Sequence, residues 1–116
     1  MNDDLLPVRA ITTDVHAAGQ LVPASMAVAA QRGYRSVVNN RPDFEGGADQ
    51  PTSASIEAAA RAAGLEYRFL PVSGAWQSPA EADALAALLD ELPRPVLLFC
   101  RSGARSTRLF IAATQR

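Results

Sequence analysis

The apolar run Val96–Cys100 constrains the fold of this chain more than any other segment. It follows two helix-breaking residues, Pro93 and Pro95, and no polar residue interrupts it. Continuous apolar runs of this length are typical of strands that are buried on both faces, as in a parallel sheet. Parallel neighbours need crossover connections, which are usually helices. The run therefore predicts a sheet that is covered by helices on both sides.

The rest of the chain alternates between strand and helix patterns. Ser78 and Glu81 form a capping box around Pro79, which marks a clear helix start. We expect helices over residues 23–32, 52–63, 78–92 and about 105–116, and strands within 34–40, 65–72 and 96–100, after short extended segments at 9–14 and 17–21. This order predicts an α/β fold with a central, mostly parallel sheet of four to five strands, in one domain over residues 1–116.

Composition and charge exclude several classes of protein. The net charge of −1 gives no general attraction to nucleic acid or to an anionic membrane, so we expect neither as a partner. No apolar run approaches the roughly 20 residues of a membrane helix, and the acidic start of the chain lacks the apolar core of a signal peptide. One cysteine cannot form an internal disulfide or a multi-cysteine zinc site. Nothing in the sequence marks a metal partner for the only histidine, His16, so we expect it on the surface or in a loop. We therefore expect a cytoplasmic protein without metal or cofactor, and eleven arginines without a lysine indicate a bacterial one.

Three loops that follow predicted strands carry polar or small residues: 39–43, 71–77 and 99–107. In α/β sheets, ligands bind beyond the carboxyl ends of the strands. Because these three loops leave such ends, we expect them to meet at one site.

The third of these loops surrounds Cys100 with arginines and small residues. Helix N-termini and neighbouring guanidinium groups lower the pKa of a cysteine and so favour the reactive thiolate. Gly103 permits a tight turn whose backbone N–H groups hold an anion, and Arg105 supplies a fork for two oxygens. We predict Cys100 and Arg105 as catalytic residues. The predicted anion-binding residues are Arg101, Ser102, Gly103, Ala104, Ser106 and Arg41.

The alternative is that Cys100 is a buried, unreactive core residue, which is the commoner role of a lone cysteine. A core cysteine does not usually precede a charged, glycine-containing loop at a strand-to-helix turn, so we favour the nucleophile.

Four further residues have open roles. Arg41 contacts the bound anion or forms a salt bridge with Asp43 or Glu45. Asp43 could serve as a general acid only if its loop folds over the site. Gln20, at a strand end, could line the pocket. Trp76 either walls the site against water or covers the core.

Several segments together resemble the beta-lactamase-hydrolase-like, phosphatase-like domain, a bacterial family with the protein tyrosine phosphatase fold of the dual-specificity type. The matching segments are residues 17–21, 33–43, 62–74 and 100–106. The resemblance implies a thiol-based transfer enzyme with Cys100 as nucleophile and Arg105 as anion clamp. Family members occur alone or fused to persulfide-dioxygenase-like or sulfide-oxidising enzymes, so a partner of that kind is implied as well.

The sequence departs from the tyrosine phosphatase pattern in three ways. The phosphatase signature has five residues between cysteine and arginine, whereas four separate Cys100 from Arg105. Phe99 replaces the usual histidine before the cysteine. The loop after the preceding strand, residues 71–79, lacks the aspartate that protonates a leaving alkoxide.

The four-residue spacing is similar to the active-site loop of single-domain rhodaneses, which move sulfane sulfur through a cysteine persulfide. A thiolate or sulfite leaving group needs an acid less than an alkoxide does. The leading hypothesis is therefore a rhodanese-like sulfurtransferase in which Cys100 takes sulfur from thiosulfate or a persulfide and passes it to a thiol such as glutathione. The alternatives are a phosphatase that hydrolyses phosphate esters through a phosphocysteine, and a non-catalytic module that senses anions or persulfides.

Overall fold

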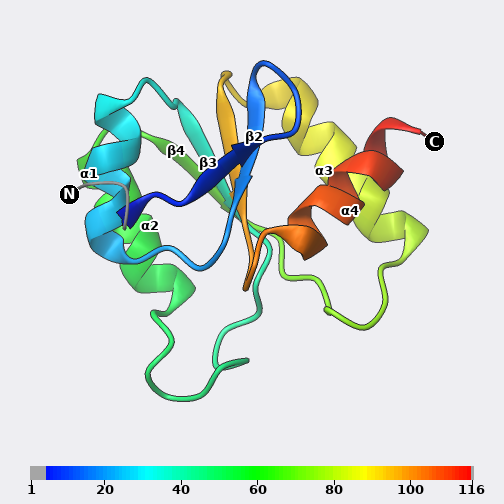
Figure 1. Ribbon diagram of the computed structural model, residues 1–116, viewed down its shortest axis with the longest axis horizontal. Helices are drawn as coiled ribbons and strands as arrows, with labels where there is room; N and C mark the ends of the chain where they lie inside the picture. The colour runs from blue at the N-terminus through cyan, green and yellow to red at the C-terminus, as the bar shows by residue number, and fades with distance from the viewer. Residues whose placement is uncertain (1–4, 116) are drawn as a thin grey trace.

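The computed structural model describes residues 5–115, which form a five-stranded sheet with helices on both faces (Figure 1). The strands are β1 Val8–Ala10, β2 Val15–Ala18, β3 Ser36–Asn39, β4 Glu66–Phe69 and β5 Val96–Phe99. Their order in the sheet is β1-β2-β5-β3-β4. The pairs β2–β5, β5–β3 and β3–β4 are parallel, and only β1 runs antiparallel to its neighbour β2. The expected mostly parallel α/β sheet is confirmed.

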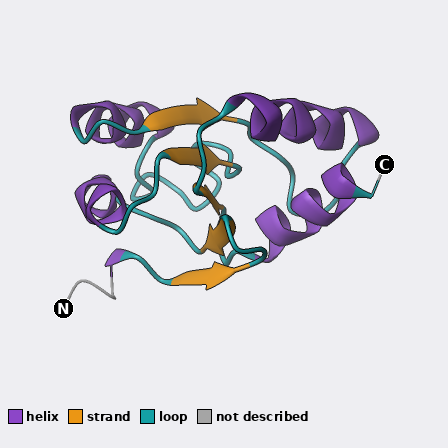
Figure 2. Cartoon of the chain, turned by 90° about the horizontal axis from the view of Figure 1, so that it is seen from above, coloured by secondary structure: helices purple, strands orange, loops and turns teal. Residues whose placement is uncertain are grey.

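The helices lie in two pairs, one on each face of the sheet (Figure 2). They are α1 Pro23–Gln31, α2 Ser53–Ala62, α3 Pro79–Glu91 and α4 Ala104–Thr114. Helices α1 and α2 cover one face, and α3 and α4 cover the other. All four agree with the expected segments within two residues at each end. Within residues 5–115, none of these helices is long and apolar enough to cross a membrane.

The start of α3 shows how local sequence fixes an element. The Ser78 hydroxyl accepts a hydrogen bond from the backbone N–H of Glu81 at 3.1 Å, and the Glu81 carboxylate accepts one from the N–H of Ser78 at 2.8 Å. Pro79 occupies the first helical position, where no N–H is needed. The predicted capping box is therefore present.

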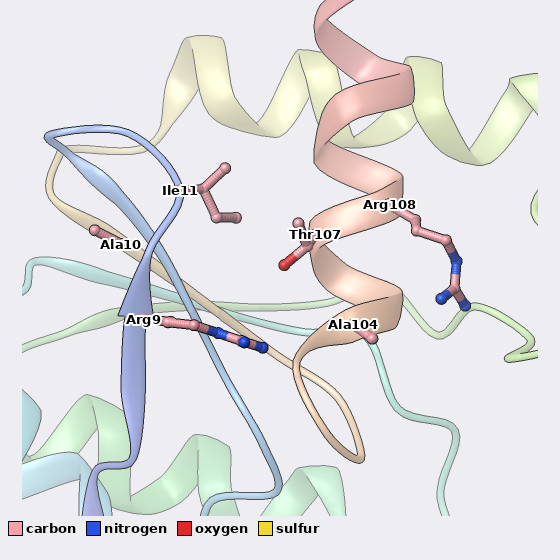
Figure 3. A pocket seen from close by; sticks show the side chains of 6 residues that line it. All are labelled: Arg9, Ala10, Ile11, Ala104, Thr107 and Arg108. Atoms are coloured by element: carbon pink, nitrogen blue, oxygen red, sulfur yellow. The ribbon is translucent and has the colours of Figure 1, made fainter.

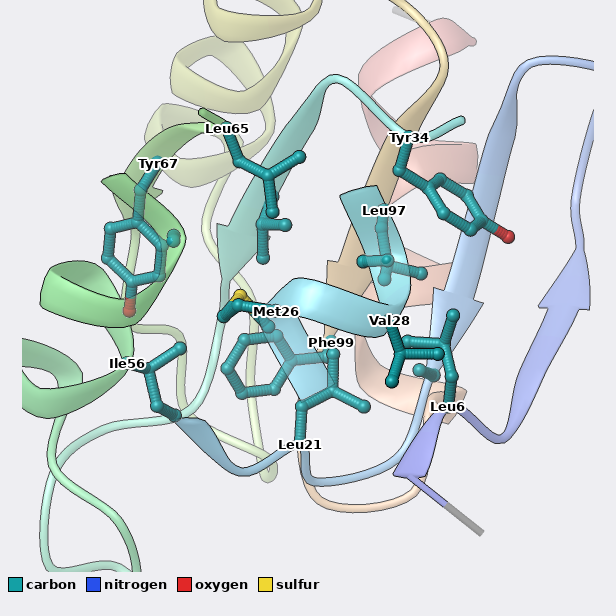
Figure 4. Close-up of a cluster of buried hydrophobic side chains, with 14 residues drawn as sticks. Leu6, Leu21, Met26, Val28, Tyr34, Ile56, Leu65, Tyr67, Leu97 and Phe99 are labelled. Atoms are coloured by element: carbon teal, nitrogen blue, oxygen red, sulfur yellow. The ribbon is translucent and has the colours of Figure 1, made fainter. Parts of the chain in front are cut away.

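Strand β5 has apolar core on both of its faces. All four of its residues are fully buried, and successive side chains point to opposite sides. Leu97 and Phe99 join the cluster beneath α1 and α2 (Figure 4), whereas Val96 and Leu98 join the cluster beneath α3 and α4. The uninterrupted apolar run is thus explained by its central place in the sheet.

The amino-terminal hairpin differs from the expected extended segments. Strand β1 ends at Ala10, and a turn in which the Thr12 hydroxyl accepts from the N–H of Val15 at 3.0 Å leads into β2. His16 lies in β2 rather than in a surface loop, and its Nδ1 is 2.6 Å from the hydroxyl of Tyr34. Its neighbours are a strand and a buried tyrosine, so the expectation of a loop histidine is corrected.

Candidate functional site

The three loops named from the sequence meet at the carboxyl end of the parallel strands. The N–H of Asn40, just after β3, donates to the carbonyl of Phe99 at the end of β5 at 2.8 Å. The N–H of Val72, after β4, donates to the carbonyl of Asn40 at 3.0 Å. The Asn40 side chain joins the segment after β4 to helix α4, because its Nδ2 donates to the Leu70 carbonyl and its Oδ1 accepts from the Ser106 hydroxyl. The expected convergence is present in the fold.

Cys100 is buried at the turn between β5 and α4, in a segment called here the Cys100 loop, residues 100–103. The N–H of Gly103 donates to the Cys100 sulfur at 3.1 Å, and the N–H of Cys100 donates to the Ala18 carbonyl at 3.3 Å. Gly103 has φ +93°, and a Cβ there would lie 3.4 Å from the Ala18 carbonyl group. The left-handed φ favours glycine here, whereas the 3.4 Å distance to Ala18 is an ordinary van der Waals contact.

The environment of Cys100 favours its thiolate. Burial by itself raises the thiol pKa, but hydrogen bonds from the backbone and hydroxyl of Ser106 and from the backbone of Ser102 and Gly103 lower the pKa below the ordinary value of 9.0. The Ser106 hydroxyl has one proton and also faces Asn40 at 2.8 Å, so it serves one acceptor at a time. The backbone N–H groups at the start of α4 are the permanent donors, and they make this turn a site for negative charge.

Arg105 lies beside this turn and is held at both ends of its guanidinium group. Its Nη1 donates to Glu45 Oε2 at 3.0 Å and to the Val72 carbonyl at 3.1 Å, and its Nη2 donates to Glu45 Oε1 at 3.0 Å. These contacts use three of the five guanidinium N–H groups, and the Nε atom is buried without a partner among the described residues. A buried N–H without an acceptor is unfavourable. Nε is thus a buried donor whose hydrogen bond no described residue accepts.

Gly74 lets the guanidinium group lie flat against the 71–77 loop. A Cβ at this position would come within 2.9 Å of Arg105 Nη2 and 3.3 Å of its Nε. The neighbouring Gln77 donates from its side-chain amide to the Arg105 carbonyl at 3.0 Å. The loop that carries the acid in phosphatases here positions an arginine instead.

Arg41 binds the same carboxylate as Arg105. Arg41 is buried, its Nε donates to Glu45 Oε1 at 2.9 Å, and its Nη1 donates to the side-chain oxygen of Gln20 at 3.0 Å. Of the open alternatives for Arg41, the structure shows the salt bridge to Glu45. Hydrogen bonds from Arg105 lower the pKa of Glu45, burial opposes this, and Arg41 lowers it further. Glu45 is therefore an anion that joins two arginines, and it is a poor proton donor.

The remaining sequence candidates lie as follows. Asp43 accepts a hydrogen bond from the N–H of Ser53 at 2.7 Å and so stabilises the start of α2. Trp76 is 69% exposed, so it does not cover the core. Arg101 is exposed, while its carbonyl accepts from the N–H of Gln20 at 3.2 Å. The anion-binding roles of Arg101, Ser102, Ala104 and Ser106 stay predictions.

The sequence pattern pointed to Glu45 only as a possible salt-bridge partner. Its place four residues after Arg41 was the available signal, but its bidentate contact joins it to Arg105, 60 residues away. Among residues 5–115, no group of three or more histidine, cysteine, aspartate or glutamate side chains is arranged to hold a metal ion.

Comparison with known proteins identifies the group to which this site belongs. A sequence profile of the "Beta-lactamase hydrolase-like protein, phosphatase-like domain" family matches residues 7–115. The chain belongs to this family. The expected family and its phosphatase-like fold are both confirmed.

Curated relatives support the family assignment, and their matches cover most of this chain but only a small part of each relative's length. A beta-lactamase hydrolase-like protein of Xylella fastidiosa is 42% identical over 81 residues, which is 70% of this chain and 19% of that protein. One from Agrobacterium fabrum is 35% identical over 94 residues, which is 81% of this chain and 22% of that protein. The chain thus spans about a fifth of the length of these relatives.

Among solved structures, a putative phosphatase of Neisseria meningitidis is similar with a TM-score of 0.80 and 27% identity. The match covers 87% of this chain and 71% of that one. These likenesses favour the phosphatase alternative over the sulfur-transfer hypothesis, and they leave the reaction itself to experiment.

Proposed function

We propose that this domain is a cysteine-dependent enzyme that hydrolyses phosphate monoesters through a phosphocysteine on Cys100. One observation carries the proposal: the buried Cys100 sulfur, with a lowered pKa, lies at the amino end of α4 beside Arg105, whose buried Nε has no acceptor. A nucleophile and an anion clamp in one turn are what attack on a charged phosphoryl group requires. The family assignment favours phosphate over other oxyanions.

The reaction would proceed in two displacements. The Cys100 thiolate attacks phosphorus, the bond between phosphorus and the ester oxygen breaks, and the leaving oxygen takes its proton from water. The backbone N–H groups of the Cys100 loop and Arg105 Nε neutralise charge on the equatorial oxygens. Water then attacks the phosphocysteine, which releases inorganic phosphate and restores the thiolate.

The leaving group limits the substrates. The 71–77 loop holds no carboxylate, Asp43 is bound to the start of α2, and Glu45 is held as an anion between two arginines. Without a positioned acid, a strongly basic alkoxide leaves slowly. We therefore propose aryl and acyl phosphates as the substrate class.

A leaving-group series tests this proposal. We expect aryl phosphate hydrolysis whose kcat/KM rises steeply as the phenol becomes more acidic, and loss of turnover in Cys100→Ser. Rapid acid quenching followed by mass spectrometry should show a phosphoryl group on Cys100 in the wild-type chain. Aryl phosphate turnover that persists in Cys100→Ser would refute the mechanism.

Sulfur transfer is the second candidate, because the loop has only four residues between Cys100 and Arg105 and lacks an acid. Here the thiolate attacks the outer sulfur of thiosulfate, the sulfur–sulfur bond breaks, and sulfite leaves with the electron pair. A thiol such as glutathione, as its thiolate, then attacks the Cys100 persulfide and takes its outer sulfur. A sulfide-oxidising or persulfide dioxygenase partner fits this candidate.

Parallel assays separate the candidates. Sulfite release from thiosulfate and glutathione, with one added sulfur atom on Cys100 and no phosphate release from any aryl ester, would replace the phosphatase proposal by sulfur transfer. No turnover in either assay, together with an ordinary Cys100 pKa, would indicate the third alternative, a non-catalytic anion-binding or persulfide-sensing module.

A further inference from the structure

A pocket lies between β1 and the first turns of α4 (Figure 3). Its volume is about 520 Å³. The residues that line it are Arg9, Ala10, Ile11, Ala104, Thr107 and Arg108. None of them takes part in the contacts of Arg105 described above, so the pocket needs its own explanation.

The pocket adjoins the Cys100 loop on the side away from Glu45. Ala104, on its wall, directly follows Gly103, whose N–H donates to the Cys100 sulfur. Arg9 pairs with Ala17 in β2, next to Ala18, whose carbonyl accepts the Cys100 N–H. The sheet order β1-β2-β5-β3-β4 places β1 on one flank of β5 and the strands that lead to Glu45 on the other. A ligand on Cys100 could therefore extend along α4 into this pocket.

The lining combines positive charge with apolar walls. Figure 3 shows the Arg9 side chain extending from β1 toward the Ala104 end of α4, with Ile11 and Thr107 facing each other further along. No ion pair of Arg9 is found among residues 5–115. Arg108, on the helix, makes only a long contact of 3.5 Å to the Gly74 carbonyl. Among residues 5–115, no acidic residue lines the pocket.

This cationic lining is not a consequence of a basic protein. The whole chain carries a net charge of −1, and the carboxylate that contacts Arg105, Glu45, is bound by two arginines. Arg9 extends into this open pocket without an acidic partner among residues 5–115, so it complements a negative ligand, whereas the Arg108 side chain points to the other side of α4 (Figure 3).

We infer that this pocket receives a second acidic group, a carboxylate or phosphate, on the part of the substrate that is not transferred to Cys100. The inference rests on the proposed function and deepens it, because it narrows the substrates to organic esters with two anionic groups. Arg9 binds the second group, and Ile11 contacts the apolar body between the groups.

Binding of phosphonates tests the inference without turnover. The experiment would measure the affinity of the chain for phenylphosphonate and for 4-phosphonobenzoate, its para-carboxylate analogue, by titration calorimetry at one ionic strength. The wild-type chain should bind the carboxylated compound about five-fold more tightly, the gain expected of one partly exposed charged contact. In Arg9→Ala this ratio should fall to about one, and Arg9→Lys should restore part of it.

Arg35→Ala is the matched control, because Arg35 is exposed just before β3 begins, at the amino end of the parallel strands and so at the end opposite the Cys100 loop. It removes the same charge and should leave the ratio unchanged. A ratio that survives in Arg9→Ala, or that falls equally in Arg35→Ala, would overturn the inference, since general electrostatics would then explain the preference.

A separate measurement keeps the pocket testable if the phosphate proposal fails. If neither phosphonate binds the wild-type chain, the phosphatase proposal is contradicted. Titration with benzoate, followed by the backbone amide signals of Ile11 and Thr107, then decides the pocket alone. Shifts that vanish in Arg9→Ala support an acid-binding pocket, and unshifted amides refute it.

Discussion

Replacing Glu45 by glutamine tests the electrostatic centre of the site. The carboxylate accepts three hydrogen bonds from two buried arginines, two from Arg105 and one from Arg41. Glutamine keeps one oxygen but turns an N–H₂ donor toward a guanidinium group, and it leaves two positive charges without an anion between them. The substitution removes charge and at least one acceptor together.

The size of the effect follows from burial. Removing one partner of a fully buried ion pair costs about 3–5 kcal/mol. The Glu45 side chain is 28% exposed while Arg105 is 10% exposed, so solvent compensates for part of the loss. We expect Glu45→Gln to lower the free energy of unfolding by about 2 kcal/mol at pH 7. In a domain of this size, that corresponds to a fall in Tm of roughly 6–12 °C.

The pH dependence identifies the cause. Because the folded state lowers the pKa of Glu45, its contribution is fully present above the unfolded value near 4.5 and is lost as pH falls through the folded pKa. The stability gap between wild type and Glu45→Gln should therefore be constant above about pH 5.5 and shrink in acid. Urea unfolding at a series of pH values, with the slope m compared at each, measures this gap.

A second glutamate provides the control. Glu57 and Arg61 have the same four-residue spacing as Arg41 and Glu45, but the Glu57 side chain is 43% exposed. Glu57→Gln should change the free energy of unfolding by no more than about 0.5 kcal/mol. Equal losses in both variants, or a gap for Glu45→Gln that does not shrink in acid, would refute the central role of Glu45.

Three further substitutions test other parts of the site. Ser106→Ala removes a hydrogen bond that lowers the pKa of Cys100, so the pH midpoint of iodoacetamide alkylation should move upward; an unchanged midpoint would assign the lowered pKa to the backbone alone. Gly74→Ala places a Cβ 2.9 Å from Arg105 Nη2, and it should reduce kcat/KM about ten-fold or more with little change in Tm; full activity would show that the guanidinium group is free to move. Phe99→Ala empties a fully buried place in the core beneath α1 and α2 and should cost about 3–5 kcal/mol in urea unfolding; a loss below 1 kcal/mol would contradict the packing described.

The departures from the phosphatase pattern now have structural meaning. Phe99 points into the apolar cluster with Leu97, so it fills core space beneath the Cys100 loop. The 71–77 loop lacks an acid, yet through Gly74 and Val72 it positions Arg105. At these two places, a packing residue and a positioning loop stand where the phosphatase pattern has polar groups, while Cys100 and Arg105 are kept.

The local sequence determined the helices, the strands and the turn that carries Cys100. The uninterrupted apolar run of β5 requires burial on both faces, the Ser78 capping box starts α3, and Gly103 permits the tight turn after Cys100. Each of these depends on residues within a few positions of one another. That is why the helices, the parallel sheet and the meeting of the loops could all be predicted.

The tertiary structure alone decided how the charges are arranged. The sequence could not show that Glu45 takes the ends of the Arg105 guanidinium group and leaves Nε free, because these residues are 60 positions apart. Nor could it place Arg9 beside α4, since that depends on β1 joining the sheet antiparallel to β2. Periodicity and spacing describe short stretches of chain, whereas an ion pair or a pocket depends on where distant stretches meet after the core has packed.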